Sequence, residues 1–357
     1  MGNVTVVGLD LAKNVFQVHG MDETGRKVTG AKLKRKELLG YFANQPPVRV
    51  GLEACGSAHY WARAIGKLGH EIKMMAPQHV KAYVQGNKTD ARDAAAIAEA
   101  ASRQSVKAVA VRDETSQQLQ ALHRVRELLM KQRIAVTNQI RGLLSEFGEA
   151  VPQGRKELRE HVALWQEKTG LSILKDLIHE LTEALNQAET RISKIEVQLK
   201  AAHLASEASQ NIETVPGVGL LSATAVIAAF GDCRQIDTSR KFACCLGITP
   251  REHSNGGTQK LLGISKRGNG YVRKLLVHGA RSVLKARMNK PAHAEDWEVK
   301  LAKRRGHNIA AVALAAKNAR RIWAIFEFVT PLTLGAVSGA SLPVWSMGPR
   351  ARIRVLS

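Results

Sequence analysis

Several kinds of segment are missing from this 357-residue sequence. It has no uninterrupted apolar run of about 18 residues, so we expect no membrane-spanning helix. Its first residues, MGNVTVVGLD, lack the basic start of a secretory signal peptide. Its four cysteines show no C-x-x-C spacing, which predicts reduced thiols in a cytoplasmic protein. These absences point away from membrane proteins and from secreted, disulfide-stabilised proteins.

Acidic residues are scarce relative to basic ones. The sequence has 31 Asp and Glu residues against 53 Lys and Arg residues, a formal net charge of +22 at pH 7. Such an excess indicates a polyanionic partner, either nucleic acid or an anionic membrane surface. Residues 231–330 contain 20 of the basic residues and only 7 of the acidic ones. We therefore expect the polyanion-binding surface mainly in the C-terminal part.

The chain is too long for one ordinary core, and its pattern changes along the sequence. Residues 1–113 contain Val-rich alternating segments, later separated by helical ones, which predicts a mixed α/β sheet. Residues 114–205 have apolar residues at helical spacing, which predicts two long helices in an antiparallel coiled-coil hairpin or a dimer interface, with a turn region at 148–171. Residues 206–330 are predicted to be mainly helical, and residues 331–357 form an atypical tail without acids.

Four acidic residues are the candidate catalytic and metal-binding residues. Asp10 and Glu53 end predicted strands, and strand ends of α/β sheets are where polar groups gather into sites. Asp90 and Asp93 open an alanine-rich helix for which Thr89 is a candidate N-cap. Acids in a first helical turn are ordinary, but two of them on one face repel each other. A pair of Mg²⁺ ions between four converging carboxylates would remove that repulsion.

Two glycine-containing segments of the C-terminal part are candidate nucleic-acid contacts. In the VPGVG turn, Gly217 and Gly219 lie between two predicted helical stretches, which resembles a helix-hairpin-helix. In such a motif the glycines let backbone N–H groups approach a phosphate. The alternative is a plain turn between two helices. The segment 246–274 is glycine-rich and basic, with Ser254 embedded in it. The candidate phosphate-binding residues of this segment are Arg251, Lys260, Lys266, Arg267, Arg273 and Lys274.

Several motifs, in the same order, resemble the DEDD transposases of the insertion-sequence-110 family of bacterial mobile elements. GLDLAK, GLEACGSAHYWAR and NKTDARDAAAIAEA carry the four acids, and VPGVG, LGITPREHSNGG and GISKRGNGYVRKLLVHGAR match the second half. The resemblance covers residues 1–327. It implies an RNase H-like (RuvC-like) catalytic domain at 1–113 and a C-terminal transposase domain at 206–330.

The resemblance also implies a mechanism and partners. The four acids would hold Mg²⁺, as two ions, and Ser254 would attack a DNA phosphate to form a covalent phosphoserine intermediate. Family members often carry two serines at this motif, and Asn255 stands in place of the second. The implied partners are target and donor DNA, a structured bridge RNA encoded by the element, and further copies of the chain in a dimer or tetramer. The implied location is the bacterial cytoplasm.

Two other functions fit the same residues. A structure-specific endonuclease of the Holliday-junction type needs the four acids but not Ser254. A non-catalytic nucleic-acid-binding protein needs only the basic surface, and its acids would be helix caps. His253 is the neighbouring candidate helper of Ser254, although adjacent side chains often point apart. The tail at 331–357 lacks family character and is expected to be disordered or to come from a shifted reading frame.

Overall fold

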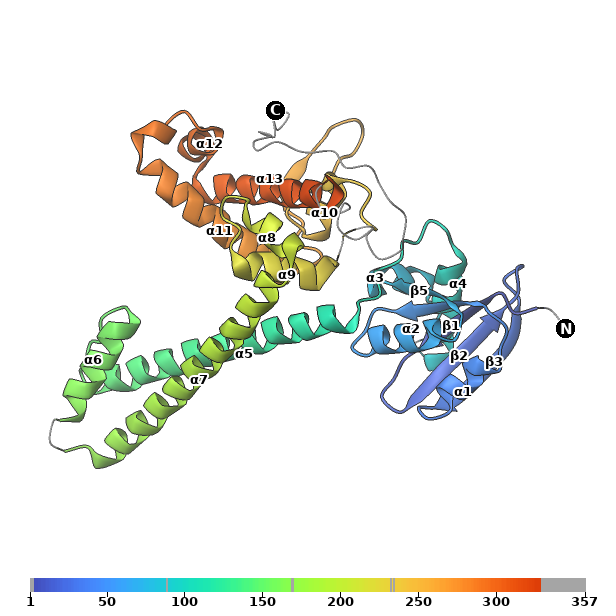
Figure 1. The fold of residues 1–357 in the computed structure, drawn as a ribbon, viewed down its shortest axis with the longest axis horizontal. Coiled ribbons are helices and arrows are strands. Elements are labelled where there is room, and N and C mark those ends of the chain that lie inside the picture. Colours follow the sequence, from blue (N-terminus) through green and yellow to red (C-terminus); the bar gives the residue numbers. More distant parts are fainter. Residues whose placement is uncertain (1–2, 88, 168–169, 232, 234, 329–357) are drawn as a thin grey trace, which may run out of the picture.

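The computed structural model describes residues 3–87, 89–167, 170–231, 233 and 235–328. This part of the chain forms an N-terminal α/β unit, a pair of long helices and a C-terminal helical unit (Figure 1). The tail at 331–357 lies outside the described residues. Every described helix is too short or too polar to cross a lipid bilayer.

The N-terminal unit is built on a five-stranded mixed sheet. Its strands are β1 (Val6–Asp10), β2 (Val15–Met21), β3 (Lys27–Lys34), β4 (Arg49–Glu53) and β5 (Glu71–Met75), in the order β3-β2-β1-β4-β5. Strand β2 runs antiparallel to β1 and β3, whereas β1, β4 and β5 are parallel. The mixed sheet predicted from the alternating Val-rich segments is confirmed.

Helices pack on both faces of this sheet. The helices of the unit are α1 (Leu38–Ala43), α2 (Ala58–Gly66), α3 (Pro77–Val80), η1 (Lys81–Tyr83) and α4 (Asp90–Ser102). In β1, Val7 and Leu9 are buried against α1 and α2, while Val6 packs with α4. Because side chains alternate along a strand, α4 covers the face opposite α1 and α2.

Two long helices extend away from both units. Helices α5 (Glu114–Glu146) and α7 (Ser172–Leu204) lie side by side, and α6 (Arg155–Gln166) sits at their far end (Figure 1). The predicted turn region at 148–171 thus contains a helix. Its residues Leu158, Val162 and Trp165 recur at helical spacing and are buried in one cluster with residues of α5 and α7. This burial stabilises a short helix despite the breakers that precede it.

The C-terminal unit is mainly helical, as predicted. Its elements are α8 (Glu207–Glu213), α9 (Leu220–Phe230), α10 (Ser239–Cys245), β6 (Pro250–Glu252), β7 (Leu261–Ile264), α11 (Gly270–Met288), η2 (Pro291–His293), α12 (Trp297–Arg305) and α13 (His307–Phe328). In its core, α8, α10 and α11 pack against α13, and α9 packs on α8 and α11. Strands β6 and β7 pair antiparallel as a separate two-stranded sheet.

Arg112, in the linker before α5, ties the N-terminal unit to the C-terminal one. Its backbone N–H donates to Nδ1 of His59 at 3.1 Å, and its guanidinium donates to the carbonyl of Ala229 in α9 at 3.1 Å. Arg63 of α2 donates in turn to the Arg112 carbonyl at 2.6 Å. The two units therefore meet at the beginning of α5.

Candidate active site

Asp10 and Glu53 lie at the same edge of the N-terminal sheet. They are the last residues of β1 and β4, which are adjacent and parallel with Gly8 paired to Gly51. A Cβ on either glycine would collide with α4, so both glycines face that helix. Each acid follows its glycine by two residues and therefore also lies on the α4 face.

Helix α4 brings the other two acids towards this edge. Its C-terminal end lines the same surface as the amino end of β1, so its first turn lies on the side where β1 ends. The buried residues Ala94 and Ile97 face the sheet, and Asp90 and Asp93 precede them by one turn on the same stripe. The alanines of α4 are explained by the close contact with Gly8, which larger side chains would prevent.

The first turn of α4 has the predicted N-cap. Oγ1 of Thr89 accepts a hydrogen bond from the backbone N–H of Arg92 at 3.3 Å. Asp90 is exposed and Asp93 is half-buried, as are Asp10 and Glu53. Among the residues that the structure describes, no three His, Cys, Asp or Glu side chains lie close enough to hold a metal ion. The four carboxylates are the right chemical type for Mg²⁺ and share one edge, but as placed they form no closed ligand set.

Ser254 is displayed near the tip of a hairpin that we call the serine hairpin (residues 250–264). Every residue from Pro250 to Gly263 is exposed. The chain reverses between Asn255 and Thr258, whose backbones exchange two hydrogen bonds of 3.3 and 3.0 Å. The hydroxyl of Ser254 is therefore open to a large substrate such as a nucleic-acid strand.

The base of the serine hairpin is held by close backbone contacts. The N–H of Lys266 donates to the carbonyl of Gly247 at 3.0 Å, and the N–H of Ser265 donates to the carbonyl of Thr249 at 2.9 Å. A Cβ on Gly247 would collide with the backbone of Arg267, so only glycine fits there. Lys266 itself has a φ of 55°, which is uncommon for a residue with a side chain. The hairpin thus projects from a base whose two arms are joined by backbone hydrogen bonds.

The predicted phosphate-binding residues divide into two groups. Arg251, Lys260, Lys266 and Arg267 are exposed, and within the described residues no ion pair engages their side chains. Arg273 instead donates to the Leu246 carbonyl at 2.7 Å, and Lys274 pairs with Glu127 of α5 at 2.6 Å. The structure therefore gives Arg273 and Lys274 intramolecular roles and leaves the first four as the exposed cationic group.

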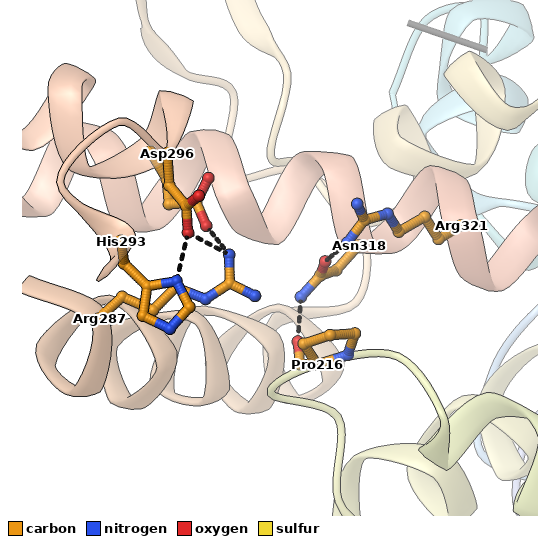
Figure 2. Close-up of polar contacts among 7 residues, drawn as sticks. Pro216, Arg287, His293, Asp296, Asn318 and Arg321 are labelled. Carbon is orange, nitrogen blue, oxygen red and sulfur yellow. Dashed lines mark hydrogen bonds and ion pairs between the residues drawn. The ribbon is translucent and has the colours of Figure 1, made fainter. Parts of the chain in front are cut away.

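The VPGVG turn connects α8 and α9, and it packs against the rest of the C-terminal unit. Figure 2 shows the buried side chain of Asn318 donating to the carbonyl of Pro216, at 2.8 Å. Gly217 has a φ of 84° and lies so close to Gly279 of α11 that a Cβ on either glycine would overlap the other's carbonyl group. Gly219, the residue before α9, is exposed. Helix packing thus accounts for Gly217, while Gly219 is open to a ligand.

A second cluster in Figure 2 neutralises part of the basic charge. Arg287 of α11 contacts Asp296 at 3.3 Å, and His293 contacts the same carboxylate at 2.9 Å. Arg287 also pairs with Glu298, whose side chain is buried. These contacts hold α11 against the start of α12, so Arg287 belongs to the fold rather than to the exposed cationic group.

Sequence reasoning missed one polar residue at the hairpin. Oγ of Ser254 donates a hydrogen bond to Oε1 of Glu252 at 2.6 Å, whereas the residue predicted to help Ser254 was the adjacent His253. Residues two apart on a strand share a face and residues one apart do not. No strand was predicted over these residues, so the i, i+2 relation of Glu252 and Ser254 became visible only once the structure showed the hairpin.

The N-terminal α/β unit, which carries the four acids, and the basic C-terminal helical unit both match families of known proteins. Residues 7–148 match the model of the DEDD transposases of IS110 type, described as a transposase. Residues 209–298 match the model described as the transposase IS116/IS110/IS902 family. The protein is thus a transposase, which places it among the enzymes that cut and join DNA.

Relatives along most of the chain narrow this class. The chain is 47% identical over 330 residues to a probable family 20 transposase of Pseudomonas aeruginosa, covering 91% of this chain and 97% of the relative. It is 43% identical over 329 residues to the transposase for insertion sequence element IS1111A of Coxiella burnetii (91% and 90%). It is 37% identical over 326 residues to that for IS1328 of Yersinia enterocolitica (91% and 97%). The chain belongs to the IS110 family of DEDD transposases, which confirms the resemblance of its motifs.

Proposed function

We propose that this transposase cuts and rejoins DNA through a covalent phosphoserine intermediate formed on Ser254. The observation that carries this proposal is the position of Ser254 near the tip of a projecting, firmly based hairpin. The exposed side chains of Arg251 and Lys260 flank it and can bind the phosphates of a DNA strand. A serine that served only to cap a turn would not need this basic surrounding.

We propose that the N-terminal unit is an RNase H-like (RuvC-like) domain whose four acids hold Mg²⁺, as two ions. The strand order β3-β2-β1-β4-β5, with β2 antiparallel to its neighbours, supports this fold. The four carboxylates at one edge would be the ligands, and they would have to move closer together to close the ligand set. Bound Mg²⁺ supplies charge stabilisation at the scissile phosphate.

The proposed serine and acid sites lie on different units, so DNA has to bring them together. They can meet within one chain or across a homodimer or tetramer. Exposed apolar side chains along the long helices support self-association, because such residues are ordinarily covered. They include Val125, Leu128 and Ile134 of α5 and Ile173, Leu177, Val197 and Leu204 of α7, each about half exposed or more.

We propose a structured bridge RNA as the second nucleic-acid partner. The family resemblance implies it, and the net charge of +22 supports a chain that binds more than one polyanion. The test is to purify the protein after expression together with the flanking DNA of its element and to sequence the bound RNA. A discrete RNA from the non-coding flank is expected, whereas a random sample of cellular RNA would contradict this part of the proposal.

The phosphoserine proposal is tested by Ser254→Ala. Wild-type protein incubated with DNA of the element ends, element-derived RNA and Mg²⁺ should give a protein–DNA adduct on a denaturing gel. Ser254→Ala should bind the same DNA equally and give no adduct. If Ser254→Ala still cuts the DNA to free ends, the chain acts instead as a junction-type endonuclease that uses only the four acids.

A further inference from the structure

The register of the serine hairpin places Ser254 and Glu252 on one face. Gly256 and Gly257 form the two-residue loop, with φ of 56° and 78°, and both values are left-handed, as a type I′ turn requires. The backbone N–H of His253 donates to the carbonyl of Lys260 at 2.9 Å, which fixes the pairing across the hairpin. Because side chains alternate along a strand, His253 lies on the opposite face from Ser254.

Three side chains on this face form a connected chain of hydrogen bonds. Oγ of Ser254 donates to Oε1 of Glu252 at 2.6 Å. Nε2 of Gln259, from the other arm of the hairpin just before β7, donates to the same Oε1 at 3.3 Å. The backbone N–H of Lys260 donates to Oγ of Ser254 at 3.3 Å. The hydroxyl proton of Ser254 therefore points at a carboxylate that a second side chain orients.

We propose that Glu252 is the general base that activates Ser254, and that Gln259 is the positioning residue that orients its carboxylate. The inference rests on the proposed function of Ser254 as the nucleophile. A nucleophile bonded to a base, and a base bonded to an orienting group, is the arrangement that activates weak hydroxyl nucleophiles. The base here is the last residue of β6, two residues before the nucleophile.

The chemistry of the step balances without any further reactant. Oγ of Ser254 forms a bond to phosphorus, and the bond between phosphorus and one ester oxygen of the DNA breaks. The Ser254 proton passes to Glu252, and the released DNA oxygen takes a proton from water. Rejoining reverses each transfer: a DNA hydroxyl attacks phosphorus and gives up its proton to water, and protonated Glu252 returns its proton to Oγ.

The charge of Glu252 suits this role. The hydrogen bond from Ser254, then that from Gln259, lowers the pKa of the Glu252 carboxyl below its usual value of 4.5. The carboxyl is therefore ionised at neutral pH and can accept a proton, although its lowered pKa makes it a weaker base than an unperturbed glutamate. His253 faces away and cannot reach Oγ by the same route.

The experiment measures the rate of adduct formation for wild type, Glu252→Gln, Glu252→Asp and Ser254→Ala. The probe is a DNA duplex copied from the element ends, with RNA transcribed from the element flank and Mg²⁺. Glu252→Gln keeps a hydrogen-bonding side chain but cannot take the proton, so its rate should fall about 10²–10⁴-fold with unchanged DNA binding. Glu252→Asp should recover part of the rate. The matched control is Glu295→Gln, an exposed glutamate that pairs with Lys300 far from the hairpin, and it should react at the wild-type rate.

The pH dependence separates a base from a merely structural residue. Above neutral pH the Glu252→Gln rate should rise about tenfold per pH unit, since hydroxide replaces the missing base, while the wild-type rate stays flat. A Glu252→Gln rate within threefold of wild type would overturn the assignment of Glu252, as would a large loss that follows the wild-type pH profile. The proposed function fails separately, if Ser254→Ala still forms the adduct or wild type forms none.

Discussion

Acidification should loosen the attachment of the C-terminal helices to α5 through His123. This buried residue of α5 lies with Nδ1 3.0 Å from the hydroxyl of Tyr271 on α11 and Nε2 3.1 Å from Oγ1 of Thr224 on α9. Thr224 donates its own proton to the Leu220 carbonyl at 2.7 Å. Nε2 of His123 is therefore the donor to Thr224, and Nδ1 accepts from Tyr271. A second proton on Nδ1 would reverse this bond, so that the Tyr271 hydroxyl would have to accept and its own proton would lose its acceptor.

The size of the effect follows from the pKa of His123. Burial, and then the charge of Arg126, lowers this pKa from 6.5 to about 4. As pH falls, the unfolded chain takes up the proton first, so stability is complete above pH 6.5 and is lost between pH 6.5 and 4. The total loss is about 3 kcal/mol, of which about 2 kcal/mol is lost by pH 5.

The assay compares wild type with His123→Gln. Amide hydrogen exchange of peptides from α9 and α11, corrected for intrinsic rates, gives their local opening free energies at pH 7 and pH 5. Because other groups also titrate, only the difference between the two proteins counts. Wild type should lose about 2 kcal/mol more than His123→Gln over this range. Equal losses in the two proteins, or a His123 pKa above 6 measured by exchange of the imidazole C2 hydrogen, would refute the reasoning.

Three further changes test the packing, the nucleic-acid surface and the acids. Gly279→Ala should destabilise the C-terminal unit by about 1–3 kcal/mol in thermal unfolding, because the new Cβ would overlap a carbonyl group. Gly142→Ala, which has open space around it in α5, should instead stabilise the protein by roughly 0.5–1 kcal/mol. Equal effects of the two changes would contradict the close contact at α11. Replacing Lys266 by Asn together with Arg267 by Gln should flatten the log–log salt dependence of DNA binding by about 1–2 units, and an unchanged slope would place the contacts elsewhere. Asp10→Asn should abolish strand cleavage on a gel while DNA binding stays near the wild-type level, and cleavage at the wild-type rate would exclude a metal role for Asp10.

The positions of the four acids at one edge of the sheet could largely be predicted from the sequence, because strand alternation and helix capping depend on neighbouring residues. Alternating residues in β1 and β4 predicted strands, and parallel strands carry their last residues to one edge, so Asp10 and Glu53 were expected together. Thr89 before an alanine-rich run predicted the start of α4, and the structure confirms the cap. In each case the signal lies within a few consecutive residues.

The roles of other residues depended on contacts between distant segments. Gly217 was predicted to approach a phosphate, and the structure adds a packing role, because it lies against Gly279, about 60 residues later in the chain. Lys274 was predicted to bind a phosphate, and it pairs with Glu127 on α5. No short sequence pattern predicts a contact partner so far away in the chain, because residues at many other positions could have made the same contact.

The sequence by itself determined the strands and helices of the N-terminal unit, the two long helices, the positions of Asp10 and Glu53 at strand ends and the family; it missed α6 and the hairpin strands β6 and β7. Strand alternation, helix caps and motif order are properties of neighbouring residues, and they hold however the units are arranged. Only the tertiary structure decided that Ser254 faces Glu252 rather than His253, that Gln259 orients this carboxylate and that the serine projects from a base whose two arms are joined by backbone hydrogen bonds. Those relations depend on strand register, and a shift of one residue would turn every side chain of the hairpin to the other face.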